Sequence, residues 1–137
     1  MKVQSYLFFE GRCEEALEFY KEKIGAKVTA LMRYSESPAP PREGCTPPPG
    51  DKVMHANFSV GETQIMASDG NCSGKPNFQG AALVINVDKE PEAERIFGAL
   101  SEGGQVFMPL EKTFFSPKFG MLNDKFGLMW MVITAQE

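Results

Sequence analysis

The stretch VQSYLFF at residues 3–9, followed by EEALEFYKEKI at 14–24, decides the fold because its plan returns later in the chain. In each copy an apolar run of strand length precedes a short helix that begins with acidic residues and ends near glycine. The second copy is ALVINV at 82–87 followed by EAERIFGAL at 92–100. The copies lie roughly 78 residues apart, too far for a solenoid of short repeats. We therefore predict two large modules, each of which must bury one face of its sheet.

Further apolar runs of strand length complete each module. The predicted strands lie at 3–9, 27–34, 53–60 and 63–69 in the first module and at 82–87, 105–110, 114–122 and 128–134 in the second. Asp88 is the predicted N-cap of the second helix. The predicted fold class is α+β, with two βαβββ modules that form a mixed, curved eight-stranded sheet and carry the helices on its outer face. The modules are expected at 1–69 and 81–137, joined by a linker at 70–80, within a single domain that covers 1–137.

Composition narrows the classes of partner. The chain has 14 Lys and Arg against 18 Asp and Glu, a net charge of −4 that disfavours nucleic acid. It has no apolar run of the roughly 20 residues that a membrane span needs and no signal-peptide pattern, so we expect a cytoplasmic protein with no membrane partner. Eleven Phe and eight Met predict a core that is aromatic and soft.

Two segments leave alternatives open. Six of the ten prolines lie in residues 36–50, which excludes a helix or central strand there and predicts a lid or, in preference, a partly disordered loop. The three cysteines, at 13, 45 and 72, lack disulfide or zinc spacing and are expected to be reduced thiols. Cys13 at a helix start is either a reactive thiol or a packing residue, and packing is the preferred interpretation.

Several short motifs occur in an order that resembles a known superfamily. They are FFEG at 8–11, ALEFY at 16–20, HAN at 55–57, IMASD at 65–69, SGK at 73–75 and NDKFG at 123–127. The chain resembles the vicinal oxygen chelate superfamily, which includes glyoxalase I, bleomycin-resistance proteins and extradiol dioxygenases, and within it the PhnB-like branch described as demethylubiquinone methyltransferase-like. The resemblance implies the paired βαβββ fold and a homodimer. It names no reaction, because one fold hosts many chemistries.

Enzymes of this superfamily hold a divalent ion with His and Glu side chains from the first and fourth strands of each module. The resemblance places Ser5, Met66, Ala82 and Met131 at those four positions. None of these side chains is a competent ligand, and the chain has a single histidine. We therefore predict no metal or other cofactor, with an atypical site of carboxylates and His55 as the less favoured alternative.

The expected binding groove is lined by polar and apolar side chains. If strands 53–60 and 63–69 pair as a hairpin, His55 and Asp69 approach each other, and an Asp-oriented imidazole is a candidate general base. The equally weighted alternative is that His55 only ties the sheet together. The predicted ligand-binding residues are Phe9, Asn57, Gln64, Ser68, Asn86, Phe115, Phe119, Met121 and Met131. Trp130 is predicted to face the helix as core.

Two function classes follow. The first is a small-molecule-binding protein of the glyoxalase/bleomycin-resistance type without the usual metal, recognised by saturable binding without turnover. The second is an enzyme, a lyase, isomerase or dioxygenase-like protein that uses His55 and Asp69 or an atypical metal site on a small organic substrate. A purely structural or interaction protein is disfavoured by the concave sheet.

Overall fold

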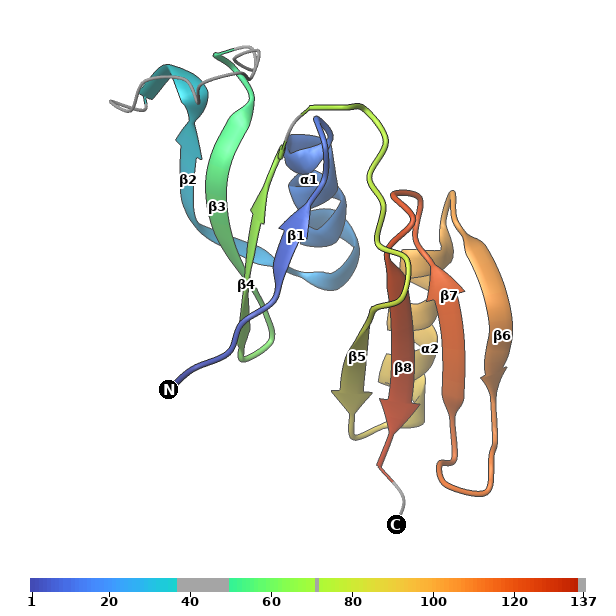
Figure 1. Ribbon diagram of the computed structural model, residues 1–137. Helices are drawn as coiled ribbons and strands as arrows, with labels where there is room; N and C mark the ends of the chain where they lie inside the picture. The colour runs from blue at the N-terminus through green and yellow to red at the C-terminus, as the bar shows by residue number, and fades with distance from the viewer. Residues whose placement is uncertain (37–49, 71, 136–137) are drawn as a thin grey trace. The chain divides into compact units, whose positions relative to one another are not determined.

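A computed structural model describes residues 1–36, 50–70 and 72–135 (Figure 1). The chain divides into two compact units, Met1–Pro76 and Asn77–Glu137. The predicted fold class is confirmed, because each unit is a βαβββ module with its own mixed four-stranded sheet.

The first unit pairs its strands in the order β1-β4-β3-β2. Its elements are β1 (Tyr6–Phe8), α1 (Cys13–Ile24), β2 (Lys27–Arg33), the short 3-10 helix η1 (Tyr34–Glu36), β3 (Val53–Val60) and β4 (Thr63–Ser68). The β1–β4 pair is parallel, and the β4–β3 and β3–β2 pairs are antiparallel. Helix α1 begins with Glu14 and Glu15 and ends at Gly25, whose positive φ of 70° terminates the helix.

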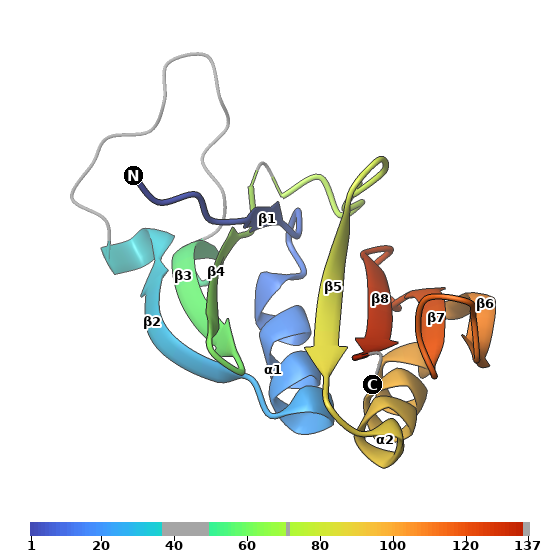
Figure 2. The same ribbon diagram turned by 90° about the horizontal axis from the view of Figure 1, so that it is seen from below.

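Helix α1 covers one face of the first sheet, as Figure 2 shows. Tyr20 on this helix is fully buried and stacks on Phe58 of β3 with ring centroids 6.0 Å apart. Its ring also contacts Phe9, directly after β1, at 6.1 Å. Because side chains alternate along a strand, this contact assigns one face to the core and leaves the other uncovered by the helix.

The second unit repeats the plan with the order β5-β8-β7-β6. Its elements are β5 (Ala82–Val87), α2 (Glu90–Ser101), β6 (Gln105–Glu111), β7 (Phe119–Asn123) and β8 (Met129–Thr134). Phe97 of α2 lies against Gly120 of β7, where an added Cβ would come within 2.6 Å of the Phe97 ring. The glycine is therefore required for close approach of helix and sheet.

Trp130 lies in the core of the second unit, as predicted. Its side chain is 1% exposed, and its indole Nε1–H donates to an oxygen of the buried Asp124 at 2.8 Å. The other Asp124 oxygen accepts from the backbone N–H groups of Phe126 and Leu128. One carboxylate thus holds the turn between β7 and β8 and fixes the indole beneath it.

Some predicted boundaries are wrong. Residues 114–118 lie in the loop before β7, because the Ser116 N–H donates to Thr113 Oγ1 and the Thr113 N–H donates to the Ser116 carbonyl. Lys89, not Asp88, occupies the N-cap of α2. The proline-rich segment falls largely on residues 37–49, which lie outside the described residues, as does Cys45. Neither helix in the described part of the chain is long and apolar enough to cross a membrane.

The prediction of a methionine-rich core is wrong. All eight methionines are described, and none is among the buried apolar residues of either unit. The core is built from Phe, Leu, Val, Ile, Ala, Tyr and Trp side chains together with Cys13. The soft side chains therefore lie elsewhere on the sheets.

Candidate functional site: the open faces of the two sheets

The face of the first sheet that α1 does not cover carries aromatic, methionine and polar side chains. Strand register places Tyr6, Met66 and Asn57 in one row across β1, β4 and β3, and pairs Met32 with His55. We call this surface the first open face, made of Tyr6, Phe8, Met32, His55, Asn57 and Met66. These side chains are half-buried or exposed, so a ligand could reach them.

Tyr6 and His55 form the polar centre of the first open face. The Tyr6 hydroxyl lies 3.0 Å from His55 Nδ1, and the two rings are 5.6 Å apart. Because β4 lies between β1 and β3, this contact spans an intervening strand. Phe8 adds an apolar wall, with its ring 4.9 Å from that of Tyr6.

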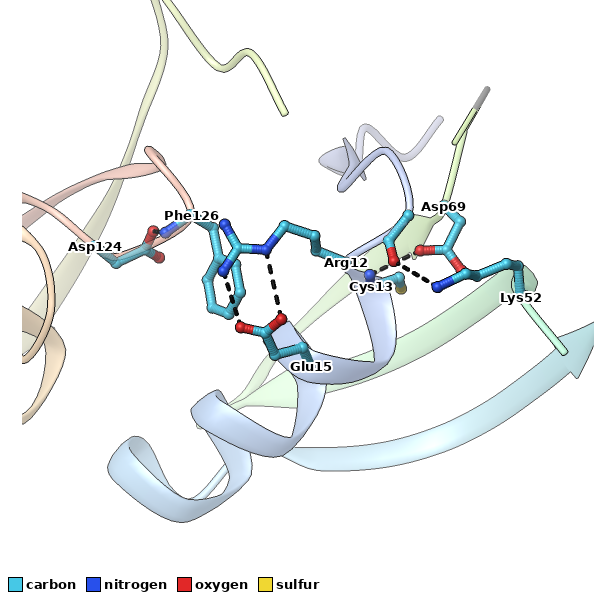
Figure 3. A network of polar contacts seen from close by, with 8 residues as sticks. Arg12, Cys13, Glu15, Lys52, Asp69, Asp124 and Phe126 are labelled. Atoms are coloured by element: carbon cyan, nitrogen blue, oxygen red, sulfur yellow. Dashed lines mark hydrogen bonds and ion pairs between the residues drawn. The ribbon is translucent and has the colours of Figure 1, made fainter. Parts of the chain in front are cut away.

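Asp69 does not orient His55. It is 1% exposed, and its two carboxylate oxygens accept from the backbone N–H groups of Cys13, at 2.7 Å, and Val53, at 2.5 Å (Figure 3). The carboxylate therefore satisfies the first turn of α1 and the start of β3. Alternation gives the reason, because Ile65, Ala67 and Asp69 share the helix-covered side. A catalytic role for either residue stays a prediction.

The other predicted ligand-binding residues of this unit divide between the two faces. Asn57, Gln64 and Ser68 lie on the open side, although the Ser68 hydroxyl is buried and accepts from the Gly70 N–H at 3.1 Å. Phe9 lies on the opposite side, fully buried against Tyr20, and belongs to the core. Its neighbour Phe8, 54% exposed, is the phenylalanine that the open face presents.

The second open face lies opposite α2. Its central row crosses all four strands and consists of Val84, Met131, Met121 and Met108. A neighbouring row joins Asn86, Ile133 and Phe119. Phe115, 37% exposed, extends the apolar surface through an edge contact with Phe119 at 5.0 Å. The predicted residues Asn86, Phe115, Phe119, Met121 and Met131 thus lie together.

Methionine distribution is the feature that both open faces share. Six of the eight methionines lie on these faces by strand register: Met32, Met66, Met108, Met121, Met129 and Met131. Flexible, polarisable thioethers adapt to ligands of different shape and are common on promiscuous binding surfaces. From the sequence, Met121 and Met131 were predicted as ligand-binding residues but the other four were not, because a methionine count does not say which face of a strand the side chains occupy.

The four positions that the superfamily uses for a metal do not fit one here. Ser5 and Met66 are adjacent, since the Ser5 carbonyl accepts from the Met66 N–H at 3.0 Å, but they offer a hydroxyl and a thioether. In the second unit Ala82 and Met131 offer a methyl group and a thioether. Among residues 1–36, 50–70 and 72–135, no three His, Cys, Asp or Glu side chains gather as a metal site requires.

Cys13 is a packing residue in this structure. It is fully buried, and burial, followed by the nearby Asp69 and Glu14 carboxylates, raises the pKa of its thiol far above the ordinary range. The helix N-terminus is therefore outweighed by desolvation and like charge. Cys72 is partly exposed, and burial and Asp69 also raise the pKa of its thiol.

The raised Cys13 pKa predicts a loss of stability in alkali. The folded thiol stays protonated while the unfolded thiol ionises above about pH 9, so its contribution is complete below that pH and falls as pH rises. We expect wild type to lose up to about 1.4 kcal/mol per pH unit more than Cys13→Ala above pH 9. Urea unfolding of both proteins at pH 8, 9 and 10 measures this, and equal slopes would contradict it.

Comparison with known proteins identifies the family. Residues 1–133 match the family described as 3-demethylubiquinone-9 3-methyltransferase. Protein YjdN of Escherichia coli (strain K12) is 32% identical over 143 residues, covering 100% of this chain and 97% of YjdN. The crystal structure of protein PA1353 from Pseudomonas aeruginosa is 39% identical, with a TM-score of 0.84 and coverage of 100% and 99% of the two chains.

A more distant protein shares the fold alone. The glyoxylase/bleomycin resistance protein/dioxygenase domain from Frankia sp. EAN1pec is 14% identical, with a TM-score of 0.62 and coverage of 98% of this chain and 94% of that domain. The likeness between the two chains is therefore one of fold. The chain therefore belongs to the family described as 3-demethylubiquinone-9 3-methyltransferase.

Proposed function

We propose that this protein binds a small organic molecule with an apolar or aromatic body on the open faces of its sheets, without the divalent ion of related enzymes. The observation that carries this proposal is the placement of six methionines on those faces while the core contains none. An apolar surface that served only stability would be buried by the helices. Here the helices cover the opposite faces.

Two features favour binding over catalysis. The Asp69 carboxylate is engaged by two backbone N–H groups, so it does not serve as the acidic partner of a His55 base. The four family metal positions carry hydroxyl, thioether and methyl groups. The family description names a methyltransferase, but no G-x-G-x-x-G turn follows any strand of this sequence, and we do not propose methyl transfer.

The family resemblance is the basis for proposing the cellular location and the oligomeric state of the protein. We propose a cytoplasmic homodimer that sequesters its ligand in the manner of a resistance-type module. The net charge of −4 disfavours a nucleic acid as the ligand. In a dimer with closed symmetry, each open face would occur twice, giving equivalent sites.

Calorimetric titration of the full chain with a panel of aromatic acids, aliphatic acids and sugars tests this proposal. We expect saturable binding of aromatic compounds without their turnover. Met121→Lys places a charge in the central row of the second open face and should weaken that binding about 10- to 100-fold if the ligand lies there. Val3→Lys is the control, since Val3 is 89% exposed and precedes β1.

Two results would count against the proposal. The first is saturable binding only to sugars. The second is aromatic binding that survives both Met121→Lys and a matching Met66→Lys change on the first open face. Elemental analysis of the same protein should give less than about a tenth of an equivalent of transition metal, as expected without three ligands.

A further inference from the structure

The Tyr6–His55 contact bears on which ring nitrogen of His55 carries the proton. A neutral imidazole carries one N–H and one acceptor nitrogen, and the hydrogen bond at one nitrogen decides which of them holds the proton. His55 Nδ1 lies 3.0 Å from the Tyr6 hydroxyl, which is its only hydrogen-bond partner among residues 1–36, 50–70 and 72–135. Whether the Tyr6 hydroxyl donates or accepts this hydrogen bond therefore determines whether Nε2 is a donor or an acceptor.

The phenol is the better donor of the two groups. Its oxygen lone pair is drawn into the ring, whereas the imidazole lone pair lies in the ring plane and accepts strongly. In the described part of the chain the Tyr6 hydroxyl has no other hydrogen-bond partner, so its proton points to Nδ1 if it is to be satisfied within the protein. We infer that Tyr6 holds neutral His55 in the tautomer protonated at Nε2, so that the ring presents a hydrogen-bond donor to the first open face.

This tautomer determines which kind of ligand atom His55 can bind on the first open face. A ring with its acceptor engaged by Tyr6 and its donor free binds an acceptor atom, such as a carbonyl or carboxylate oxygen, and does not act as a general base. Phe8 and Met66 flank the pair with apolar surface. The preferred ligand is thus an apolar or aromatic molecule that bears an acceptor oxygen. The ligand class rests on the proposed function, whereas the tautomer does not.

Tyr6 is a positioning residue in this account, and its test needs a readout besides affinity. Because His55 is the only histidine of the chain, ¹⁵N-histidine labelling gives one pair of ring resonances. At about pH 9, where an ordinary imidazole is neutral, we expect Nε2 to show the protonated type of shift and Nδ1 the unprotonated, hydrogen-bonded type. Tyr6→Phe should move Nδ1 toward its unbonded shift and raise the fraction protonated there.

Tyr34→Phe is the matched control. It removes a hydroxyl of the same unit that donates to the Gly70 carbonyl at 3.2 Å, and it should leave both His55 resonances unchanged. A wild-type spectrum with the proton on Nδ1 would overturn the inference. So would a Tyr6→Phe spectrum identical to wild type in a protein whose circular dichroism shows it to be folded.

Two probes test the ligand class. Benzoate offers an aromatic ring with acceptor oxygens, and benzylamine offers the same ring with donors only. Benzoate should shift the Nε2 resonance and bind about 2- to 10-fold more weakly to Tyr6→Phe, the loss of one oriented hydrogen bond. Tighter binding of benzylamine would overturn the ligand class. If neither probe binds but Nε2 holds the proton, the proposed function fails and the tautomer assignment is supported.

Discussion

Replacing Asp69 by alanine is expected to destabilise the protein by about 2–6 kcal/mol. The change leaves two buried donors, the N–H groups of Cys13 and Val53, without an acceptor, and each unpaired group costs about 1–3 kcal/mol. Asp69→Asn should lose less, because its amide oxygen can still accept one of the two bonds. Urea unfolding followed by circular dichroism measures the three stabilities.

Asp88→Ala is the control for this prediction, since Asp88 is exposed and precedes α2 without capping it. We expect that change to stay within about 0.5 kcal/mol of wild type. The structural role of Asp69 would be contradicted by an Asp69→Ala protein as stable as Asp88→Ala. In that case the carboxylate would be free for the chemistry that its position near the strand end first suggested.

Replacing Trp130 by alanine is expected to cost about 3–5 kcal/mol. The indole is the largest fully buried side chain, and its loss leaves a cavity in the second unit and removes the Nε1–H that donates to buried Asp124. Trp130→Phe keeps much of the ring volume but loses the Nε1–H donor, so it should cost less than Trp130→Ala. Circular dichroism is the appropriate probe, because Trp130 is the only tryptophan of the chain.

Met129→Ala tests whether burial, rather than position along β8, determines how much a truncation destabilises the protein. Met129 adjoins Trp130 in β8 but lies half-exposed on the open side. Its truncation should therefore cost clearly less than that of Trp130. If both truncations cost the same, the assignment of the two faces of β8 would be contradicted.

Much of the fold was predictable because strand alternation and helix ends are local signals. In VMHANFSV at 53–60 a period of two places His55 and Asn57 opposite Ala56 and Phe58, and the structure has the same separation. The same reasoning placed Trp130 in the core. These predictions needed only the period of two in a strand and one apolar face.

The site was harder because it depends on register and on contacts between distant strands. Tyr6 was not predicted, since its bond to His55 crosses β4 and follows from the parallel pairing of Tyr6 with Met66. A signal existed for Asp69, which shares the parity of Ile65 and Ala67 and so belongs to the covered side. From the sequence, Phe9 was chosen over Phe8 for the site. Two adjacent phenylalanines in an apolar run do not show which of them faces the core, and only the contact of Phe9 with Tyr20 decides this.

Methionine placement carries the functional account. Leucine or isoleucine would make these faces equally apolar, whereas methionine adds flexibility that suits an adaptable binding surface. The two open faces differ in the side chains of their central rows. The first row consists of Tyr6, Met66 and Asn57, and the second consists of Val84, Met131, Met121 and Met108. The first open face carries polar groups and the imidazole of His55, whereas the central row of the second is wholly apolar.

Methyl NMR of protein labelled with ¹³C-methyl methionine tests the central claim most directly. During titration with an aromatic acid that binds saturably, we expect shifts among Met32, Met66, Met108, Met121, Met129 and Met131 and none at Met1, which is fully exposed at the chain start. Shifts confined to one open face would also show which sheet holds the ligand. Saturable binding that leaves all six open-face methionines unperturbed would contradict the account.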